Sequence, residues 1–255
     1  MMAKLLFLLT ILVILPPPLV HAQQTQRVAP QVNVNVNDRV YSFEQPIRLS
    51  VLLSVVANQG DWHWPASAVY KLGIPQELGS EAEIKAKLVD FSKRLSARNP
   101  SSTRTIQRII NDIMQWQIAD RLDIALDYDR TRLLKHKNPL LTPGNYLFRL
   151  REHPKTITAI GTLQNTDTLT YRPNMKAADV VDDAGQTNIT NPDFVYVIAP
   201  NGEIEKRGIA YWNIDLTPIA PGSLVVALVR ESILGDDERQ FNEFLVELAR
   251  NRVLP

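Results

Sequence analysis

The side chains best suited to chemistry lie in residues 121–132, where Arg121 and Arg132 flank Asp127 and Asp129. Asp127 and Asp129 are two residues apart, so on a strand they would share one face, like the paired carboxylates of a glycosidase. A hydrolase needs its carboxyls about 5–9.5 Å apart across a cleft, and a neighbouring arginine keeps both of them ionised. We therefore do not expect the two aspartates to act as a catalytic pair.

Arg121 fits a binding role better than a catalytic one. The planar guanidinium group binds a carboxylate or a phosphate through two parallel hydrogen bonds, which suits an anionic sugar or a phosphate group. A structural alternative stays open, in which Asp127 or Asp129 holds Arg121 and pins a loop.

Two groups of aromatic residues are candidates for stacking on a sugar ring. Trp62 and Trp64 stand in one loop, and Tyr211 and Trp212 precede Asn213 in an Ala-Tyr-Trp-Asn stretch. A flat ring matches the C–H face of a pyranose, but large aromatic side chains more often bury about 150–250 Å² each in a core. We expect the tryptophan loop to cover a core and the later pair to be buried at a domain seam. We expect Asn213 to bind a loop backbone.

Composition excludes several other chemistries. The chain has 255 residues, 28 basic and 27 acidic, so it lacks the basic excess that nucleic-acid binding needs. It has 10 glycines against 17 prolines, which argues against a glycine-rich phosphate loop. The sequence has no Gly-x-Ser-x-Gly motif and no HExxH motif. No catalytic residue, metal site or cofactor is therefore predicted.

Residues 1–22 have the pattern of a secretory signal peptide. Lys4 supplies a positive charge, an apolar run follows from Leu5 to Leu15, and three prolines end it. The run is shorter than the roughly 20 residues that a membrane span requires, so we expect cleavage near Ala22 rather than a retained anchor.

The chain contains no cysteine. An exported protein without cysteine has no disulfides and no lipid-modified cysteine to hold it at a membrane. Secreted eukaryotic domains of this size usually carry disulfides, whereas bacterial periplasmic proteins need not. These observations predict a periplasmic protein without a stable membrane anchor.

The mature chain begins with β structure and continues with two helices. Val32, Val34 and Val36 alternate with asparagines, which predicts a strand with one buried face, and residues 41–43 are its expected hairpin partner. Residues 47–56 are read as a short helix with one buried side. Apolar residues at helical spacing then predict a helical hairpin at about 80–118, starting with a capping box at Ser80. It either projects toward a partner or is a structural insertion.

The second half of the chain predicts a compact α+β unit followed by a final helix. Strands are expected at 145–150, 156–163, 168–171, 194–198, 202–206 and 224–229, with a short helix at 177–182. Asn201-Gly202 supplies the positive φ of a hairpin turn. Residues 238–252 form an amphipathic pattern, and the glutamates on its polar side favour packing on the body over a lipid surface.

Several stretches, in order over nearly the whole mature chain, resemble the GfcC family of capsule-biosynthesis proteins. They are Trp62 with Trp64-Pro65-Ala66; Arg121 with Leu126-Asp127-Tyr128-Asp129 and Arg132; Asn138-Pro139-Leu140 with Gly144-Asn145-Tyr146; Val197-Ile198 with Pro200-Asn201-Gly202; Ala210-Tyr211-Trp212-Asn213; and Pro218 with Pro221-Gly222-Ser223.

The resemblance implies an α+β fold of two tandem β-grasp domains, similar to periplasmic domains of the Wza polysaccharide exporter. A helical hairpin or bundle is inserted in the first domain, and an amphipathic helix closes the chain. The implied boundaries are 23–154, with the insertion at about 80–118, then 155–232, then 233–255. It also places an arginine, Arg121, in the cleft between the domains.

The resemblance further implies a periplasmic accessory role in capsule or extracellular polysaccharide biosynthesis or export. The protein would bind polysaccharide or the export machinery without catalysis. Nothing in the sequence itself indicates self-association, so we expect a monomer. The alternative is a periplasmic polysaccharide-modifying enzyme acting in the cleft near Arg121. The candidate ligand-binding residues of this cleft are Arg121, Asp127, Asp129, Arg132, Trp64, Tyr211, Trp212 and Asn213.

Overall fold

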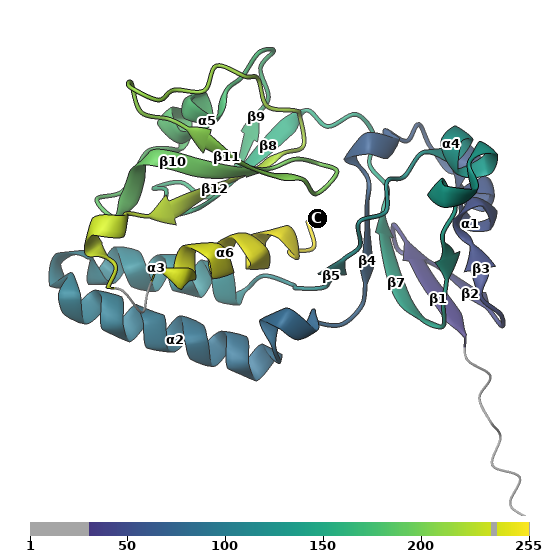
Figure 1. Cartoon of the computed structure of the whole chain (residues 1–255), viewed down its shortest axis with the longest axis horizontal. Coiled ribbons are helices and arrows are strands. Elements are labelled where there is room, and N and C mark those ends of the chain that lie inside the picture. Colours follow the sequence, from purple (N-terminus) through teal and green to yellow (C-terminus); the bar gives the residue numbers. More distant parts are fainter. Residues whose placement is uncertain (1–30, 236–238, 255) are drawn as a thin grey trace, which may run out of the picture.

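The computed structural model describes residues 31–235 and 239–254. The expected signal peptide at 1–22 lies outside these residues. The protein is α+β, as expected, and is built on two five-stranded mixed sheets (Figure 1).

The first sheet has the strand order β2-β1-β7-β4-β5, with β1 and β7 parallel and the other pairs antiparallel. Its strands are β1 (Val32–Val36), β2 (Arg39–Phe43), β4 (Ala68–Lys71), β5 (Asp120–Arg121) and β7 (Gly144–Arg149). The alternating valines of β1 are buried and their asparagines are not, which confirms the predicted strand and its partner β2.

The helix α1 (Leu49–Val56) covers one face of the first sheet, where its leucines join the buried valines in one core. It confirms the predicted short helix, although the two residues before it form a strand. That strand, β3 (Ile47–Arg48), pairs with β6 (Leu140–Leu141).

The second sheet has the order β11-β10-β12-β8-β9, with β12 and β8 parallel. Its strands are β8 (Thr156–Gly161), β9 (Thr168–Thr170), β10 (Thr190–Ile198), β11 (Ile204–Gly208) and β12 (Leu224–Val229). When the five strands of each sheet are numbered along the chain, both sheets read 2-1-5-3-4, with strands 1 and 5 parallel. The helix α5 (Ala177–Ala184) packs on one face of the second sheet.

The helical hairpin leaves the first sheet between β4 and β5 and packs on the second sheet. It consists of α2 (Glu81–Arg98) and α3 (Thr103–Met114). The predicted capping box is present: Ser80 Oγ accepts a hydrogen bond from the Glu83 N–H, and the Glu83 carboxylate accepts one from the Ser80 N–H. Figure 1 shows the hairpin lying along the second sheet, so it is no projecting arm.

The helix α6 (Gln240–Arg250) completes this layer. Phe241, Leu245 and Leu248 are buried in one core together with the hairpin and the second sheet, and the Phe91 and Phe241 rings stack. The core therefore contains residues from three parts of the chain that are far apart in sequence.

The remaining helical elements are short. They are α4 (Tyr128–Leu133) and turns of 3-10 helix at Ala57–Gln59, Trp64–Ala66, Gln76–Leu78, Pro100–Ser102, Lys135–Lys137 and Glu231–Ile233. Within the described residues, none of the helices has the length and apolar character of a membrane span.

Leu88→Ala should destabilise the whole molecule, because Leu88 is fully buried in the core that the hairpin shares with the second sheet. We expect a loss of about 2–5 kcal/mol in the free energy of unfolding, measured by urea denaturation. The exposed neighbour Val89→Ala should change it by no more than about 0.5 kcal/mol. Two separate unfolding transitions, only one of them shifted by Leu88→Ala, would contradict a shared core.

Candidate functional site

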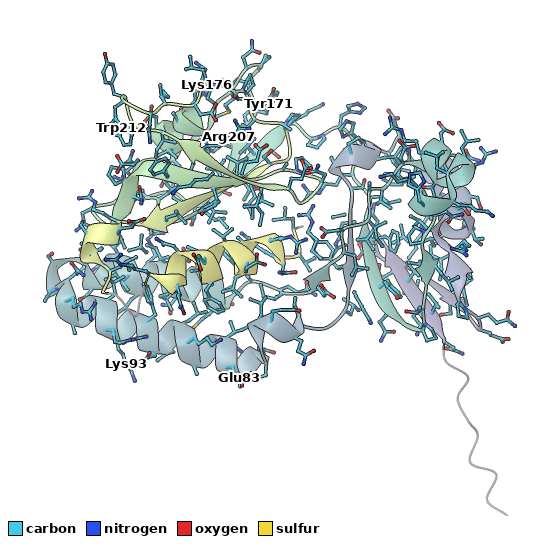
Figure 2. The ribbon with its side chains drawn as sticks, viewed as in Figure 1. Glu83, Lys93, Tyr171, Lys176, Arg207 and Trp212 are labelled. Atoms are coloured by element: carbon cyan, nitrogen blue, oxygen red, sulfur yellow. The ribbon has the colours of Figure 1, made fainter. Side chains whose placement is uncertain are left out.

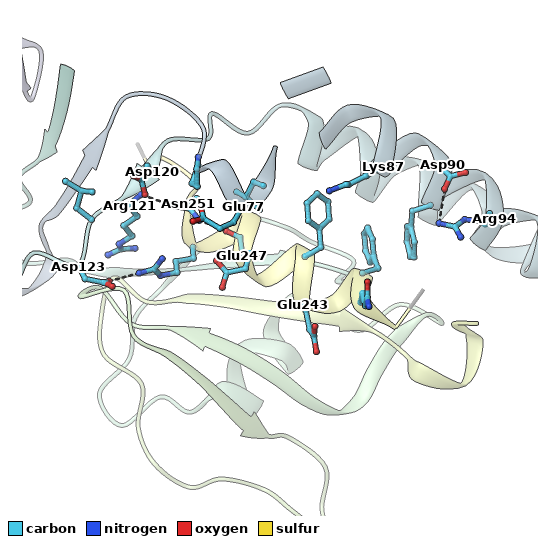
Figure 3. Close-up of a pocket in the computed structure, with 18 residues that line it drawn as sticks. Glu77, Lys87, Asp90, Arg94, Asp120, Arg121, Asp123, Glu243, Glu247 and Asn251 are labelled. Atoms are coloured by element: carbon cyan, nitrogen blue, oxygen red, sulfur yellow. Dashed lines mark hydrogen bonds and ion pairs between the residues drawn. The ribbon is translucent and has the colours of Figure 1, made fainter. Parts of the chain in front are cut away.

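A groove of about 900 Å³ opens between the helical hairpin and α6 (Figure 3). Its walls come from the 3-10 turn before α2, from the middle of α2, from β5 and the residues after it, and from α6. Its size is within the range of about 300–1,000 Å³ that small-molecule sites occupy. We take it as the candidate site.

One wall of the groove carries aromatic side chains. Phe244 of α6 is partly buried, and the Lys87 ammonium group lies over its ring at 5.3 Å from the centroid. The stacked pair Phe91 and Phe241 lies beside it. An aromatic surface next to charged groups offers stacking for the apolar face of a sugar ring and hydrogen bonds for its hydroxyls.

The groove carries more negative than positive side chains. Six carboxylates and four cations line it: Glu77, Asp90, Asp120, Asp123, Glu243 and Glu247, against Lys87, Arg94, Arg121 and Arg250. Two cations are paired within the groove, Arg94 with Asp90 at 2.8 Å and Arg250 with Asp123 at 2.5 Å. The remaining carboxylates are hydrogen-bond acceptors for hydroxyl or amino groups of a ligand.

Arg121 stands at one end of the groove and joins three parts of the chain. Its Nη2 donates a hydrogen bond to the Pro200 carbonyl in the β10–β11 turn (2.5 Å), and its backbone N–H donates to Asn251 Oδ1 just after α6 (2.9 Å). The guanidinium also lies over the Tyr70 ring at 5.9 Å. The residue is only 7% exposed, and this burial is the main reason that its pKa is lowered, with Arg250 and Arg151 adding repulsion.

Local structure places Arg121 at this point. Arg121 pairs with Tyr70 in the β4–β5 register, which sets its ring contact. The predicted hairpin turn at Asn201-Gly202 brings Gly202 against the guanidinium: a Cβ there would lie 3.0 Å from Arg121 Nε. Gly202 also has a φ of +94°, which favours glycine.

On its other side, Arg121 faces a nearly closed seam. The cavity that it lines there with Arg149, Arg151 and Pro200 holds about 10 Å³, roughly the room of one water molecule. A ligand of Arg121 must therefore approach from the groove.

The structure does not bring the predicted site residues together. Asp127 is the N-cap of α4 and accepts a hydrogen bond from the Arg130 N–H at 2.9 Å, so the two aspartates do not lie on a strand. The alternative that either aspartate holds Arg121 is also wrong, since the Arg121 side chain bonds to Pro200. Neither aspartate lines the groove.

Trp64 and Arg132 lie beside these aspartates, on the first sheet's side of the molecule. The rings of Trp64 and Tyr128 stack at 6.4 Å, and the Arg132 guanidinium lies over the Tyr128 ring at 5.2 Å. Trp62 and Trp64 pack against the first core, and Trp62 Nε1 donates to the Val56 carbonyl at 2.9 Å. The expectation that this loop covers a core is confirmed.

Tyr211 and Trp212 lie in a third place, on the loop between β11 and β12. Trp212 is labelled in Figure 2. Tyr211 is 100% exposed and Trp212 is 70% exposed, so the expected burial at a domain seam is wrong. The edge of the Trp212 ring meets the Phe194 ring at 6.2 Å. Both aromatic side chains are available for stacking on a ligand.

The loop that carries them is held by polar contacts. Asn213 accepts a hydrogen bond from the Ala210 N–H and donates one to the Asp193 carbonyl, which confirms its expected role. Asp215 pairs with Arg207 at 2.6 Å and accepts a bond from the Thr217 N–H. The Arg207 hydrogen bond, followed by that of Thr217, lowers the pKa of Asp215 to about 2.

Comparison with known proteins gives the same assignment for both halves of the chain. The family model "Capsule biosynthesis GfcC, N-terminal" matches residues 22–153, and "Capsule biosynthesis GfcC C-terminal" matches residues 166–254. The chain belongs to the GfcC family. It is also similar to a protein of Escherichia coli (strain K12) named "Uncharacterized protein YjbG", with 22% identity over 193 residues, covering 74% of this chain and 76% of the relative.

Of the residues that line the groove of this GfcC-family protein, only Arg121 was among the predicted site residues. Glu243 and Glu247 are four residues apart on α6, and Lys87 and Asp90 lie on one side of α2. The sequence shows these spacings, but it does not show that the two helix faces meet. Among the described residues, no group of three histidine or acidic side chains could hold a metal ion.

Gly202→Ala should destabilise the GfcC-family fold through the contact with Arg121. The new Cβ would force an unfavourable φ and crowd the guanidinium, at a cost of about 1–3 kcal/mol in the free energy of unfolding. Gly73→Ala is the matched control, because Gly73 also has a positive φ but a Cβ added there would have no atom within 4 Å. Urea denaturation should show the larger loss at Gly202, and equal losses would contradict the tight contact.

Asp215→Asn should weaken the aromatic loop in a pH-dependent way. The folded pKa of Asp215 is about 2, below the usual 3.8, so its ionised form stabilises the fold above about pH 4. That contribution, about 1 kcal/mol or less for a half-buried pair near the surface, is lost as the pH falls through 2. Unfolding measured from pH 7 to pH 2 should show wild type and variant converging, and a constant difference in the free energy of unfolding across that range would contradict the prediction.

Proposed function

We propose that this protein is a periplasmic accessory component of capsule or extracellular polysaccharide biosynthesis or export, which binds polysaccharide or the export machinery without catalysis. The observation that carries the proposal is the tandem match to both GfcC capsule-biosynthesis families over residues 22–153 and 166–254. The leader pattern at 1–22 and the absence of cysteine support a periplasmic location.

We further propose that each half is a β-grasp domain, as in the periplasmic part of the Wza exporter, and that α6 is the family's closing amphipathic helix. The strand order 2-1-5-3-4 with a parallel central pair, repeated in both sheets, supports this assignment. A helix packed on each sheet, α1 on the first and α5 on the second, supports it as well.

The groove is the proposed polymer site. The Phe244 ring offers a stacking face, and the carboxylates of Glu243 and Glu247 accept hydrogen bonds from sugar hydroxyls. Its six carboxylates against four cations disfavour a densely anionic polymer along its length. Only the end at Arg121 suits an acidic substituent, through the guanidinium.

Deletion of the encoding gene tests the proposed role. We expect less cell-bound polymer, or a shift of polymer between the cell-bound and secreted fractions. Unchanged polysaccharide in both fractions would refute the proposal. If the purified protein consumed or modified the polymer of its own cell, the enzyme alternative near Arg121 would replace the binding role.

Phe244→Ala tests the groove within the same system. Loss of the stacking face should weaken binding of the purified polymer about tenfold, as expected for about 1.4 kcal/mol of stacking, without a change in any turnover. Val89→Ala, on the exposed face of α2, is the control for loss of apolar surface outside the groove. Isothermal titration gives the affinity, and circular dichroism checks that both variants fold. Equal affinities would place the polymer elsewhere.

A further inference from the structure

A cluster of basic side chains occupies one segment at the α4 end of the molecule. Residues 130–140, here called the basic segment, contain four arginines and lysines, one histidine and no acidic residue. The whole chain is nearly balanced, with 28 basic and 27 acidic residues, so this concentration is local. Figure 1 shows α4 beside α1, at the end of the molecule away from the second sheet.

The same segment exposes three leucines. Leu133 is 81% exposed, Leu134 is 41% exposed and Leu140 is 47% exposed. A scattered exposed leucine is ordinary, but three leucines within eight residues, interspersed with cations, form an amphipathic surface.

The segment is held in place rather than loosely attached. Asn138 accepts a hydrogen bond from the Ser50 N–H and donates one to the Ser50 hydroxyl, and its carbonyl accepts one from Arg48. The Leu49 N–H donates to the Pro139 carbonyl, and Leu140 pairs with Arg48 in the β3–β6 ladder. The start of α1 therefore fixes the segment with its leucines facing outward.

The charges of the segment remain available. Lys135, His136 and Lys137 make no side-chain hydrogen bond or ion pair with any residue in the described ranges. Arg132 lies over the Tyr128 ring, and Arg130 lies 3.5 Å from Asp127, both as exposed side chains. A ligand with several negative charges can thus reach most of these cations without breaking an ion pair.

We propose that the basic segment docks this protein onto an anionic lipid surface. Lysines and arginines beside exposed leucines match the two layers of a membrane interface: the cations meet anionic headgroups, and the leucines enter the boundary of the acyl chains. An anionic polymer would use the cations but would leave the leucines in water. Charge and apolar exposure together therefore favour the lipid surface.

Docking through this segment leaves the candidate groove accessible. The basic segment lies around α4 and α1, while the groove lies between α2 and α6 on the other side of the first sheet (Figure 1). The docking is peripheral and reversible, and it goes beyond the proposed function because it does not depend on what the groove binds.

Vesicle flotation tests the proposal with protein purified after removal of the expected leader. The probes are vesicles of equal parts phosphatidylglycerol and phosphatidylcholine, and vesicles of phosphatidylcholine alone. We expect binding to the anionic vesicles only, reduced by added salt. The double variant Lys135→Glu with Lys137→Glu should reduce binding about tenfold or more. The double variant Leu133→Ser with Leu134→Ser should reduce binding to the same anionic vesicles by a similar factor, although it leaves the charge of the protein unchanged.

Two matched controls lie elsewhere on the surface. Lys93→Glu changes an exposed lysine of α2 (Figure 2), and Leu216→Ser changes an exposed leucine of the β11–β12 loop. Both should bind anionic vesicles like wild type, and thermal unfolding should show that all the variants fold. Equal binding to both vesicle types would overturn the proposal. Loss on charge reversal without loss in the leucine variant would overturn it too, and would point to an anionic polymer as the ligand.

Discussion

Burial of the apolar stripe of the helical hairpin is the constraint on which the rest of the structure depends. An isolated pair of helices would leave much of that stripe in water, and each large apolar side chain gains about 1.5–3 kcal/mol by burial. The first sheet, from which the hairpin leaves, already packs its core with α1. The stripe is covered instead by one face of the second sheet and by α6. This packing fixes the two sheets relative to each other.

The candidate site is a by-product of this packing. The edges of α2 and α6 beside their shared core form walls of the groove. The floor at one end is Arg121, whose buried guanidinium and backbone connect β5 to the β10–β11 turn and to Asn251. Because Arg121 links a strand of the first sheet to a turn of the second, a change of angle between the sheets would move this end of the groove. The geometry of the site therefore depends on the arrangement of the two sheets.

The sequence predicted what depends on neighbours along the chain. The alternating valines of β1, the capping box at Ser80 and the Asn201-Gly202 turn all follow local rules, and all are present. The sequence did not predict contacts between residues that are distant along the chain. Arg121 bonds to a carbonyl 79 residues away, and no periodicity predicts that pairing. The predicted burial of Tyr211 and Trp212 was wrong for another reason. Their hydrophobicity argues for burial, whereas the polar contacts of Asn213 and Asp215 hold the loop with both rings outward. The residue-level hypothesis for Asp127 failed because a helix begins there.

The contribution of α6 to the central core has a consequence for how the polypeptide acquires its structure. As the chain is made from its amino end, the hairpin is complete at residue 114, before β5 and β7 can close the first sheet. The hairpin then lacks its full cover for more than a hundred residues, because its covering surface includes α6 at residues 240–250. During that interval a stripe of isoleucine, leucine and phenylalanine side chains faces solvent. The incomplete chain is therefore prone to aggregate, and chaperones that bind exposed apolar segments would protect it.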